Sequence, residues 1–299
     1  MTTSTVDWES RAAALARGLV AEGVLTDPAW ADAFIHVPRH VFVPSVLLGD
    51  GASVQTGDPG WLDLVYSDES LLTQTISAGE GIGRHDMPSS SSSRPRVMAV
   101  MLERLNARVG DRVLEIGTGT GYNTGVIGHR LDPGNVYSID IDPKLVDTAR
   151  DHLAEIGQHS HLATGDGASG WVEHGPYDRI ISTCAVTCVP PAWIEQLADG
   201  GRIVAPLDAG EAGPLLVLDK TAPDEVTGRI DPYPVHFMPL RHRADSPLGP
   251  GQTAAFTDTG CPTTAPPPSI PHWSPRGGRI WRCGCGCTRQ ACASLPRIS

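Results

Sequence analysis

The stretch Val113-Leu-Glu-Ile-Gly-Thr-Gly-Thr-Gly-Tyr122 decides the fold of this 299-residue chain. The apolar run at 112–116 predicts a buried strand, and the three glycines after it predict a tight turn into a helix. A second apolar run at 136–141 carries the acidic residue Asp140 near its end. Strand, turn, helix and strand form a βαβ unit, and such units bind ligands at the carboxyl ends of their strands.

Strands and helices alternate beyond this motif. We expect further helices at 97–105, 123–131, 143–156 and 191–197 and further strands at 161–164, 177–183 and 202–205. This alternation predicts an α/β fold with a mostly parallel, doubly wound, Rossmann-like sheet. Residues 215–218 and 235–240 are expected to close the sheet as an antiparallel hairpin.

The composition divides the chain into three parts. Residues 1–95 are expected to hold N-terminal helices and substrate-side loops, and residues 96–245 the ligand-binding core. Residues 246–299 form a tail rich in Pro, Arg and Cys, which we expect to be irregular because it lacks a periodic apolar pattern. In its Cys283-Gly-Cys-Gly-Cys287 run the cysteines alternate with glycine, unlike the C-x₂-C pairs of zinc sites, so no metal site is expected.

The first part shows helical spacing only near its start. Apolar residues recur at helical intervals in 8–24 and again in 28–36, so two helices are expected there. Residues 49–95 are rich in Gly, Ser, Asp and Pro and are expected to form long loops with short strands such as 61–66.

Charge and hydropathy exclude several classes of protein. The formal net charge of -11 argues against nucleic-acid binding, which depends on neutralising phosphates. No apolar run approaches the ~20 residues of a membrane span, and the N-terminus has no signal-peptide pattern. We therefore expect a cytoplasmic protein that binds neither membranes nor nucleic acids.

The glycine spacing indicates which ligand the turn binds. Gly117, Gly119 and Gly121 follow the pattern G-x-G-x-G, whereas dinucleotide sites use G-x-G-x-x-G. Glu115 lies two residues before the first glycine. Its carboxylate would repel a pyrophosphate but suits a ligand that carries an ammonium and a sulfonium group.

Acidic residues at successive strand ends extend the site. Asp140 is spaced to accept hydrogen bonds from ribose hydroxyls, and Asp166 and Gly167 are placed to meet the adenine amino group. The expected cofactor-binding residues are Glu115, Gly117, Thr118, Gly119, Gly121, Asn123, Asp140, Ile141, Asp166 and Gly167.

Six segments between residues 25 and 240 resemble the protein-L-isoaspartate O-methyltransferase family. They are Val37-Pro-Arg-His-Val-Phe-Val-Pro44, Val113-Leu-Glu-Ile-Gly-Thr-Gly-Thr-Gly-Tyr-Asn123, Gly165-Asp-Gly167, Tyr177-Asp-Arg-Ile-Ile-Ser-Thr183, Gln196-Leu-Ala-Asp-Gly-Gly-Arg-Ile-Val204 and Phe237-Met-Pro-Leu240. The resemblance implies a class I methyltransferase fold and S-adenosylmethionine as methyl donor, with S-adenosylhomocysteine as product. It also implies a protein or peptide substrate whose acceptor is the carboxylate of an aspartate-derived residue.

The expected acceptor site departs from the family pattern. The family carries Thr-Ile-Ser-x-Pro directly before the helix that precedes the glycine motif. Here Thr75-Ile-Ser77 lies too far upstream, and five serines at 89–93 precede Arg94-Pro95. By register against Pro95, Ser93 takes the place of the family serine. A flexible linker is the alternative interpretation of the serine run.

On this register Ser93 is the expected catalytic residue. The expected substrate-binding residues are Ser91, Ser92, Ser93, Arg94 and His85, although a solvated loop is an alternative for the last. The arrangement resembles an actinobacterial subgroup associated with lanthipeptide pathways. Its members methylate an aspartate of a modified peptide, which leads to an aspartimide or isoaspartate.

Three other functions stay open at this stage. A repair methyltransferase acting on isoaspartyl proteins would share every motif. A catalytically silent relative would bind the cofactor and present a peptide. A nicotinamide oxidoreductase is opposed by Glu115 and by the glycine spacing.

Overall fold

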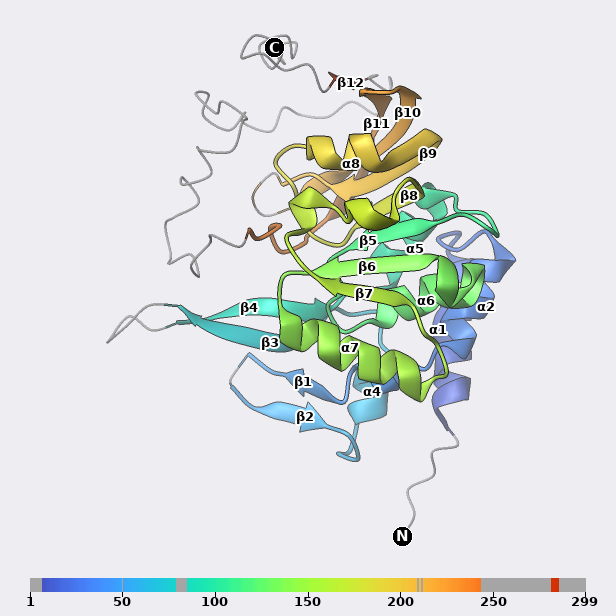
Figure 1. Ribbon diagram of the computed structural model, residues 1–299. Helices are drawn as coiled ribbons and strands as arrows, with labels where there is room; N and C mark the ends of the chain where they lie inside the picture. The colour runs from blue at the N-terminus through green and yellow to red at the C-terminus, as the bar shows by residue number, and fades with distance from the viewer. Residues whose placement is uncertain are drawn as a thin grey trace.

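An eight-stranded sheet forms the centre of the protein, in the order β12-β11-β10-β9-β8-β5-β6-β7 (Figure 1). The computed structural model describes residues 7–49, 51–78, 85–208, 210, 212–242 and 281–284, with the backbone alone at 77–78, 85 and 281–284. The strands of this sheet are β5 (Val113–Ile116), β6 (Val136–Asp140), β7 (His161–Thr164), β8 (Tyr177–Ser182), β9 (Leu197–Pro206), β10 (Gly213–Ala222), β11 (Glu225–Val235) and β12 (Trp281–Gly284).

The direction of the strands confirms the expected fold class. Neighbouring strands from β7 to β9 run parallel, whereas β10, β11 and β12 run antiparallel to β9, β10 and β11, respectively. The chain runs from β5 outward to β6 and β7 and then returns to the other side of β5 as β8. The strand order therefore reverses between β5 and β8, and ligands of such sheets bind outside the carboxyl ends of the strands at this reversal.

Helices cover both faces of the sheet. They are α5 (Pro95–Leu105), α6 (Tyr122–Leu131), α7 (Pro143–Glu155) and α8 (Pro191–Gln196), with short 3₁₀ turns η3 (Pro133–Asn135), η4 (Gly167–Ser169) and η5 (Val172–His174). Side chains of β5 alternate between two apolar clusters: Val113 joins the cluster with α5 and α6, and Leu114 joins the cluster with α8. A strand buried on both faces explains the unbroken apolar run in the sequence.

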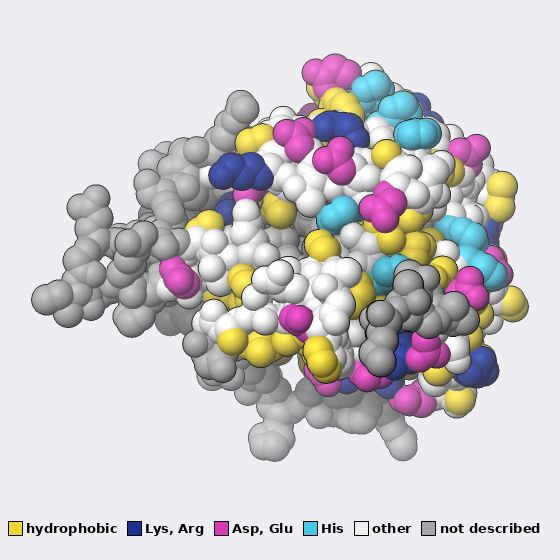
Figure 2. All heavy atoms as spheres, turned by 90° about the horizontal axis from the view of Figure 1, so that it is seen from below, with side chains coloured by type: hydrophobic (Ala, Val, Ile, Leu, Met, Phe, Trp, Pro, Cys, Tyr) yellow, Lys and Arg dark blue, Asp and Glu magenta, His cyan; other side chains and the backbone are white. Residues whose placement is uncertain are grey.

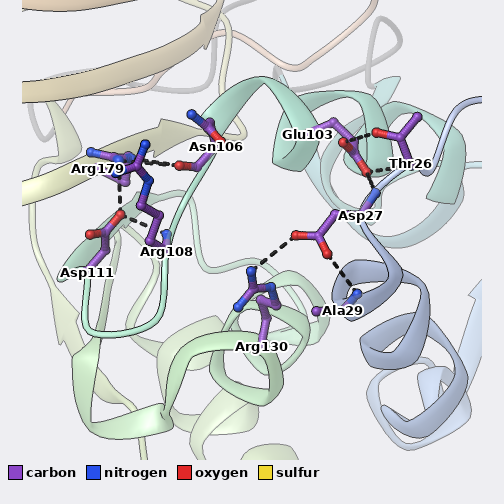
Figure 3. A network of polar contacts seen from close by, with 9 residues as sticks. All are labelled: Thr26, Asp27, Ala29, Glu103, Asn106, Arg108, Asp111, Arg130 and Arg179. Carbon is purple, nitrogen blue, oxygen red and sulfur yellow. Dashed lines mark hydrogen bonds and ion pairs between the residues drawn. The ribbon is translucent and has the colours of Figure 1, made fainter.

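The first part of the chain packs into the same core as α5 and α6. Its elements are α1 (Trp8–Ala21), α2 (Pro28–His36), α3 (Arg39–Phe42), β1 (Ser45–Leu47), β2 (Ser53–Gln55) and α4 (Trp61–Val65). Polar contacts add to this packing (Figure 3). Glu103 on α5 accepts hydrogen bonds from Thr26 and from the backbone N–H of Asp27, at 2.6–2.8 Å. Asp27 caps α2 through the Ala29 N–H and pairs with Arg130 of α6 at 3.1 Å.

The expected strand at 61–66 is wrong, because this segment is the helix α4. Gly60, with a φ of +79°, precedes its first turn, and Trp61 and Val65 are buried four residues apart. An apolar run this short fits the period of a helix as well as that of a strand.

The rest of the expected loop at 49–95 contains a β-hairpin. Its strands are β3 (Leu71–Ala78) and β4 (His85–Ser92), which pair antiparallel. The serines at 89–92 are therefore strand residues, and the flexible-linker interpretation is wrong for them. Serine runs carry no apolar alternation, so only the pairing with β3 reveals the strand.

The closing hairpin also differs from the expectation. β10 pairs with β11, which spans Glu225–Val235, rather than with 235–240. Pro223 and Asp224 make the turn between them, as suits these residue types. The segment that follows β11 approaches β8 instead, where Pro239 bridges to Ala185.

One strand of the tail belongs to the sheet. β12 pairs with β11, with Gly228 opposite Trp281 and Glu225 opposite Gly284. This edge strand contains Cys283; Cys285 and Cys287 lie outside the described residues. None of the helices that the structure describes is long and apolar enough to cross a membrane.

Candidate active site

A cavity of about 370 Å³ lies where the strand order reverses. Its lining comes from segments far apart in the chain, among them 88–94, 116–120, 139–141, 183–184 and 236–241. The cavity therefore brings the glycine turn and the serine run together. A Cβ atom at Gly119 would lie 3.7 Å from Ser90 Oγ, which shows how closely the serine strand covers the turn.

The glycine turn leaves no room for side chains at two of its positions. Gly117 has a φ of +94°, and a Cβ there would lie 2.5 Å from Thr183 Oγ1. Gly121 has a φ of +87°, and a Cβ there would lie 2.9 Å from the Cβ of Ala149. Only glycine satisfies both the backbone conformation and the close approach.

Asp140 lines the cavity at the end of β6 and is 8% exposed. Its Oδ2 accepts from the Gly119 N–H at 2.9 Å and its Oδ1 from the Asp142 N–H at 3.1 Å. Burial raises the pKa of the carboxyl, and these two hydrogen bonds act in the opposite direction. Each carboxylate oxygen keeps a further lone pair, which suits the pair of hydroxyls on a ribose.

Glu115 lies behind the cavity and is not part of its lining. The side chain is fully buried, and burial raises the pKa of its carboxyl. Its oxygens accept hydrogen bonds from Asn123 Nδ2 and Ser138 Oγ, both at 2.7 Å, and from Thr124 Oγ1. The carboxylate therefore ties the start of α6 to β6. A direct contact between Glu115 and a cofactor stays a prediction.

Asn123 lines the cavity, and its side chain belongs to the same hydrogen-bond network as Glu115. Because Nδ2 donates to Glu115, the amide orientation is set, and Oδ1 is the remaining polar atom. Among the residues that the structure describes, this buried oxygen has no hydrogen-bond partner. An unpaired buried acceptor beside a cavity suits a ligand that brings a donor such as an ammonium group.

Asp166 and Gly167 lie at the end of β7, and only Gly167 lines the cavity. The Asp166 carboxylate caps η4 by accepting from the Ala168 N–H at 2.9 Å, and it lies 3.2 Å from His242 Nδ1. Ile141 lines the cavity beside Asp140. The expected contact of Asp166 with an adenine amino group stays a prediction.

The serines of β4, together with Ser93 directly after the strand, present two kinds of hydroxyl. Ser89 donates to Gln74 Oε1 at 3.1 Å, and Ser92 Oγ accepts from Arg39 Nε at 3.3 Å. Within the described part of the chain, the half-buried hydroxyls of Ser91 and Ser93 make no hydrogen bond, although both residues line the cavity. These two hydroxyls are available to an incoming substrate.

Arg39 is a residue of this site that the sequence did not single out. Its guanidinium is fully buried beneath the serine strand and donates to the carbonyl oxygens of Val65 at 2.8 Å and Ser93 at 3.1 Å. Burial lowers its pKa to about 10, which leaves the group charged at neutral pH. The charge is satisfied mainly by backbone carbonyls, so Arg39 holds the shape of the wall that carries Ser93.

The two remaining predicted substrate residues lie at the edge of this wall. Arg94 lines the cavity, and its guanidinium pairs with Asp68 at 3.2 Å. His85 begins β4 opposite Ala78, and only its backbone is described. The role of His85 in substrate binding stays a prediction.

Several lining residues escaped the sequence analysis: Tyr122, Leu145, Thr183, Cys184 and the segment 236–241. Cys184 and His236 are two of these residues. Burial raises the pKa of the Cys184 thiol to about 12, so it stays protonated. The only signal in the sequence was that residues 177–183 and 237–240 belong to shared family segments.

The sequence of this chain is similar to those of known methyltransferases. Residues 65–245 match the model of the family described as protein-L-isoaspartate(D-aspartate) O-methyltransferase (PCMT). A protein-L-isoaspartate O-methyltransferase 1 of Anaeromyxobacter sp. is 37% identical over 79% of this chain and 97% of its own length. A protein-L-isoaspartate O-methyltransferase of Ignicoccus hospitalis is 34% identical over 78% of this chain and 98% of its own length.

Solved structures show the same fold. A protein-L-isoaspartate O-methyltransferase is 29% identical, with a TM-score of 0.59 over 75% of this chain and 64% of its own length. A putative enzyme of this kind from Plasmodium falciparum, in complex with S-adenosyl-L-homocysteine, is 16% identical, with a TM-score of 0.57 over 77% of this chain and 97% of its own length. The protein is an S-adenosylmethionine-dependent methyltransferase with a class I fold, and it belongs to the protein-L-isoaspartate(D-aspartate) O-methyltransferase family.

Proposed function

We propose that the protein methylates the free carboxylate of L-isoaspartyl residues in proteins or peptides. The observation that carries the proposal is one cavity bounded by the cofactor turn on one side and by the Ser91 and Ser93 hydroxyls on the other. The names of the relatives support isoaspartate as the acceptor, since all of the relatives described above are named for it.

The residues of the cavity divide into a donor half and an acceptor half. In this proposal, Asp140 and Gly167 bind the adenosine portion of the cofactor, and Asn123 Oδ1 accepts from its ammonium group. The bound cofactor supplies a methyl group attached to a positively charged sulfur. The serine strand faces these residues across the cavity and would hold the acceptor.

Methyl transfer to a carboxylate needs no general base. A free carboxyl group has a pKa near ~4 and is ionised at neutral pH. One of its oxygens forms the new bond to the methyl carbon, and the electrons of the broken carbon–sulfur bond stay on the sulfur. The protein therefore has to align these atoms and exclude water, and such positioning can lower a barrier by roughly 7–11 kcal/mol.

The Ser93 hydroxyl is proposed to donate to the acceptor oxygen that does not react, with Ser91 and the Arg94 backbone beside it. Hydrogen bonds from hydroxyls to a carboxylate are charge-assisted and directional. Arg39 keeps the Ser93 backbone in place from behind, through the Ser93 carbonyl.

A second acceptor is an aspartate in a ribosomally made, lanthipeptide-type peptide, whose methyl ester would collapse to an aspartimide and then to isoaspartate. The observation that favours it is the serine strand itself, which replaces the family's Thr-Ile-Ser-x-Pro segment and puts Ser92 where an isoleucine is expected. The sequence analysis preferred this aspartyl acceptor. Because the relatives are named for isoaspartate, we now rank it second.

Mass spectrometry distinguishes the two acceptors. The enzyme is incubated with S-adenosylmethionine and matched peptides that differ only in carrying isoaspartate or aspartate. A mass gain of one methyl group on the isoaspartyl peptide alone supports the first proposal, and a gain or later loss of water on the aspartyl peptide alone supports the second. No change in either peptide, despite cofactor binding, would leave the silent binding module as the better description.

The role of Ser93 is tested by Ser93→Ala. We expect methyl transfer to fall and the affinity for S-adenosylhomocysteine to stay within about twofold, because the hydroxyl lies in the acceptor half. Ser53→Ala is the matched control, since Ser53 is an exposed strand serine outside the cavity. Unchanged turnover in Ser93→Ala would remove this residue from the acceptor site.

A further inference from the structure

Three potential metal ligands meet on the surface, outside the methyl-transfer cavity. Asp32 and His36 lie four residues apart on α2, and His129 lies on α6. Asp32 Oδ2 is 2.8 Å from His129 Nε2, and Asp32 Oδ1 is 3.0 Å from His36 Nδ1. The three ligand atoms all lie within 4.8 Å of one another.

We propose that Asp32, His36 and His129 form a zinc-binding site that ties α2 to α6. Zn²⁺ prefers imidazole nitrogen and carboxylate oxygen at 2.0–2.2 Å, and sites with three protein ligands keep a water in the fourth position. In a tetrahedral site with such bonds the ligand atoms are about 3.3 Å apart. The distances from Asp32 to the two rings are already close to this value.

The scaffold presents the ligands in a fixed arrangement. The two imidazole rings lie nearly parallel, with an interplanar angle of 10° and centroids 5.7 Å apart. The two helices that carry them are packed together, and the Asp27–Arg130 ion pair links the same helices (Figure 3). Small rotations of surface side chains are therefore enough to bring the three atoms to a common ion.

The ligands are accessible and carry suitable charge. Their side chains are 54%, 58% and 32% exposed for Asp32, His36 and His129, so an ion reaches them without any opening of the fold. Figure 2 shows surface histidines beside acidic side chains on one face of the molecule.

The proposed zinc site lies apart from the methyl-transfer cavity, and we expect it to affect stability rather than catalysis. None of its three residues lines the methyl-transfer cavity. An ion bound there joins the N-terminal helices to the helix that follows the glycine turn. We expect zinc to raise the stability of the fold and to leave the acceptor and cofactor contacts unchanged.

Isothermal titration of the chelator-treated full-length chain with Zn²⁺ tests the site. Tail cysteines can also bind zinc, so the readout is the difference between variants. We expect His129→Ala and Asp32→Asn each to bind one ion fewer than the unmodified chain and to lose the zinc-dependent rise in melting temperature. His159→Ala is the control, because His159 is exposed and outside the cluster.

A Co²⁺ titration gives an independent readout of the ligand type. Cobalt bound by imidazole and carboxylate shows visible bands without the strong near-ultraviolet absorption of thiolate ligands. Loss of the thiolate-free bands in His129→Ala supports the site. Equal zinc stoichiometry in the unmodified chain and in both variants would overturn it, as would bound cobalt with thiolate absorption alone.

Discussion

At the scale of single residues, Glu115 and Asn123 form one hydrogen-bond network, of which only Asn123 lines the cavity. The carboxylate oxygens of Glu115 accept three hydrogen bonds, and the hydrogen bond from Asn123 Nδ2 orients the Asn123 amide. Among the described residues, Asn123 Oδ1 is the acceptor of this network that is left without a partner. Placing a neutral amide at the cavity avoids the larger desolvation cost of a second cavity-facing carboxylate beside Asp140.

Replacement of Asn123 should weaken binding at the amino acid end of the cofactor. For Asn123→Ala we expect a loss of about 1.5–3 kcal/mol in the binding of S-adenosylhomocysteine, the usual value of a hydrogen bond to a charged group. Binding of 5′-methylthioadenosine, which lacks the amino acid portion, should hardly change. Isothermal titration with both ligands makes the comparison, and equal losses for the two would contradict the assignment.

The Cys184 thiol should resist alkylation. Its pKa is raised from 9.0 to about 12 by burial, so the thiolate fraction at pH 8 is far lower than for an ordinary cysteine. Cys188 is exposed and serves as the control within the same chain. We expect iodoacetamide to label Cys188 first and Cys184 only after denaturation, as read by peptide mass spectrometry. Labelling of both at equal rates in the folded protein would contradict this.

At the scale of elements, the junction between β5 and α6 depends on a backbone that only glycine allows. Gly121 precedes the first residue of α6 and packs against Ala149 of α7. The same junction sets the position of Asn123, two residues further on. The start of α6 therefore couples helix packing to the cofactor site.

Gly121→Ala should destabilise the fold and weaken the cofactor site together. The new Cβ adds a close contact of 2.9 Å to the cost of a positive φ, and a left-handed backbone by itself costs roughly 1–2 kcal/mol. Gly110→Ala is the matched control, with a φ of +92° and open space around its Cβ. We expect chemical denaturation to show a larger loss in the free energy of unfolding for Gly121→Ala than for Gly110→Ala. Equal losses would mean that α7 shifts to accommodate the new Cβ without destabilising the fold.

At the scale of the whole molecule, the reversal of strand order places the cavity, and packing of the first 95 residues completes it. The parallel strands alone provide the cofactor side. The serine strand arrives from the N-terminal part, and the segment 236–241 arrives from beyond the closing hairpin. A ligand in this cavity is therefore enclosed by segments from three separate parts of the chain.

S-adenosylhomocysteine should stabilise the entire fold. A ligand at one hundred times its dissociation constant adds about 2.7 kcal/mol, which for a domain of this size raises the melting temperature by roughly 5–10 °C. NAD at equal concentration should have no effect, because the turn lacks the spacing of dinucleotide sites. Thermal denaturation monitored by circular dichroism makes the measurement. A shift with NAD alone would favour an oxidoreductase.

The sequence by itself determined the sheet, the glycine turn and the identity of the cofactor. The positions of Val113 in a strand, Gly121 in a turn and Asp140 at a strand end could be predicted, because strand periodicity, turn chemistry and strand ends are local properties of a continuous segment. The expected strand 161–164 and helix 123–131 appear as β7 and α6 within one residue for the same reason. The serine run was located correctly before α5, although its strand conformation was missed.

Only the tertiary structure decided which side chains reach the cavity. Arg39 supports Ser93 across more than fifty positions of sequence, Asn123 rather than Glu115 faces the cavity, and the segment 236–241 lines it instead of closing the sheet. These outcomes depend on which distant segments bury one another. Contacts of this kind come from the packing of a whole core, and no local pattern of residues encodes them.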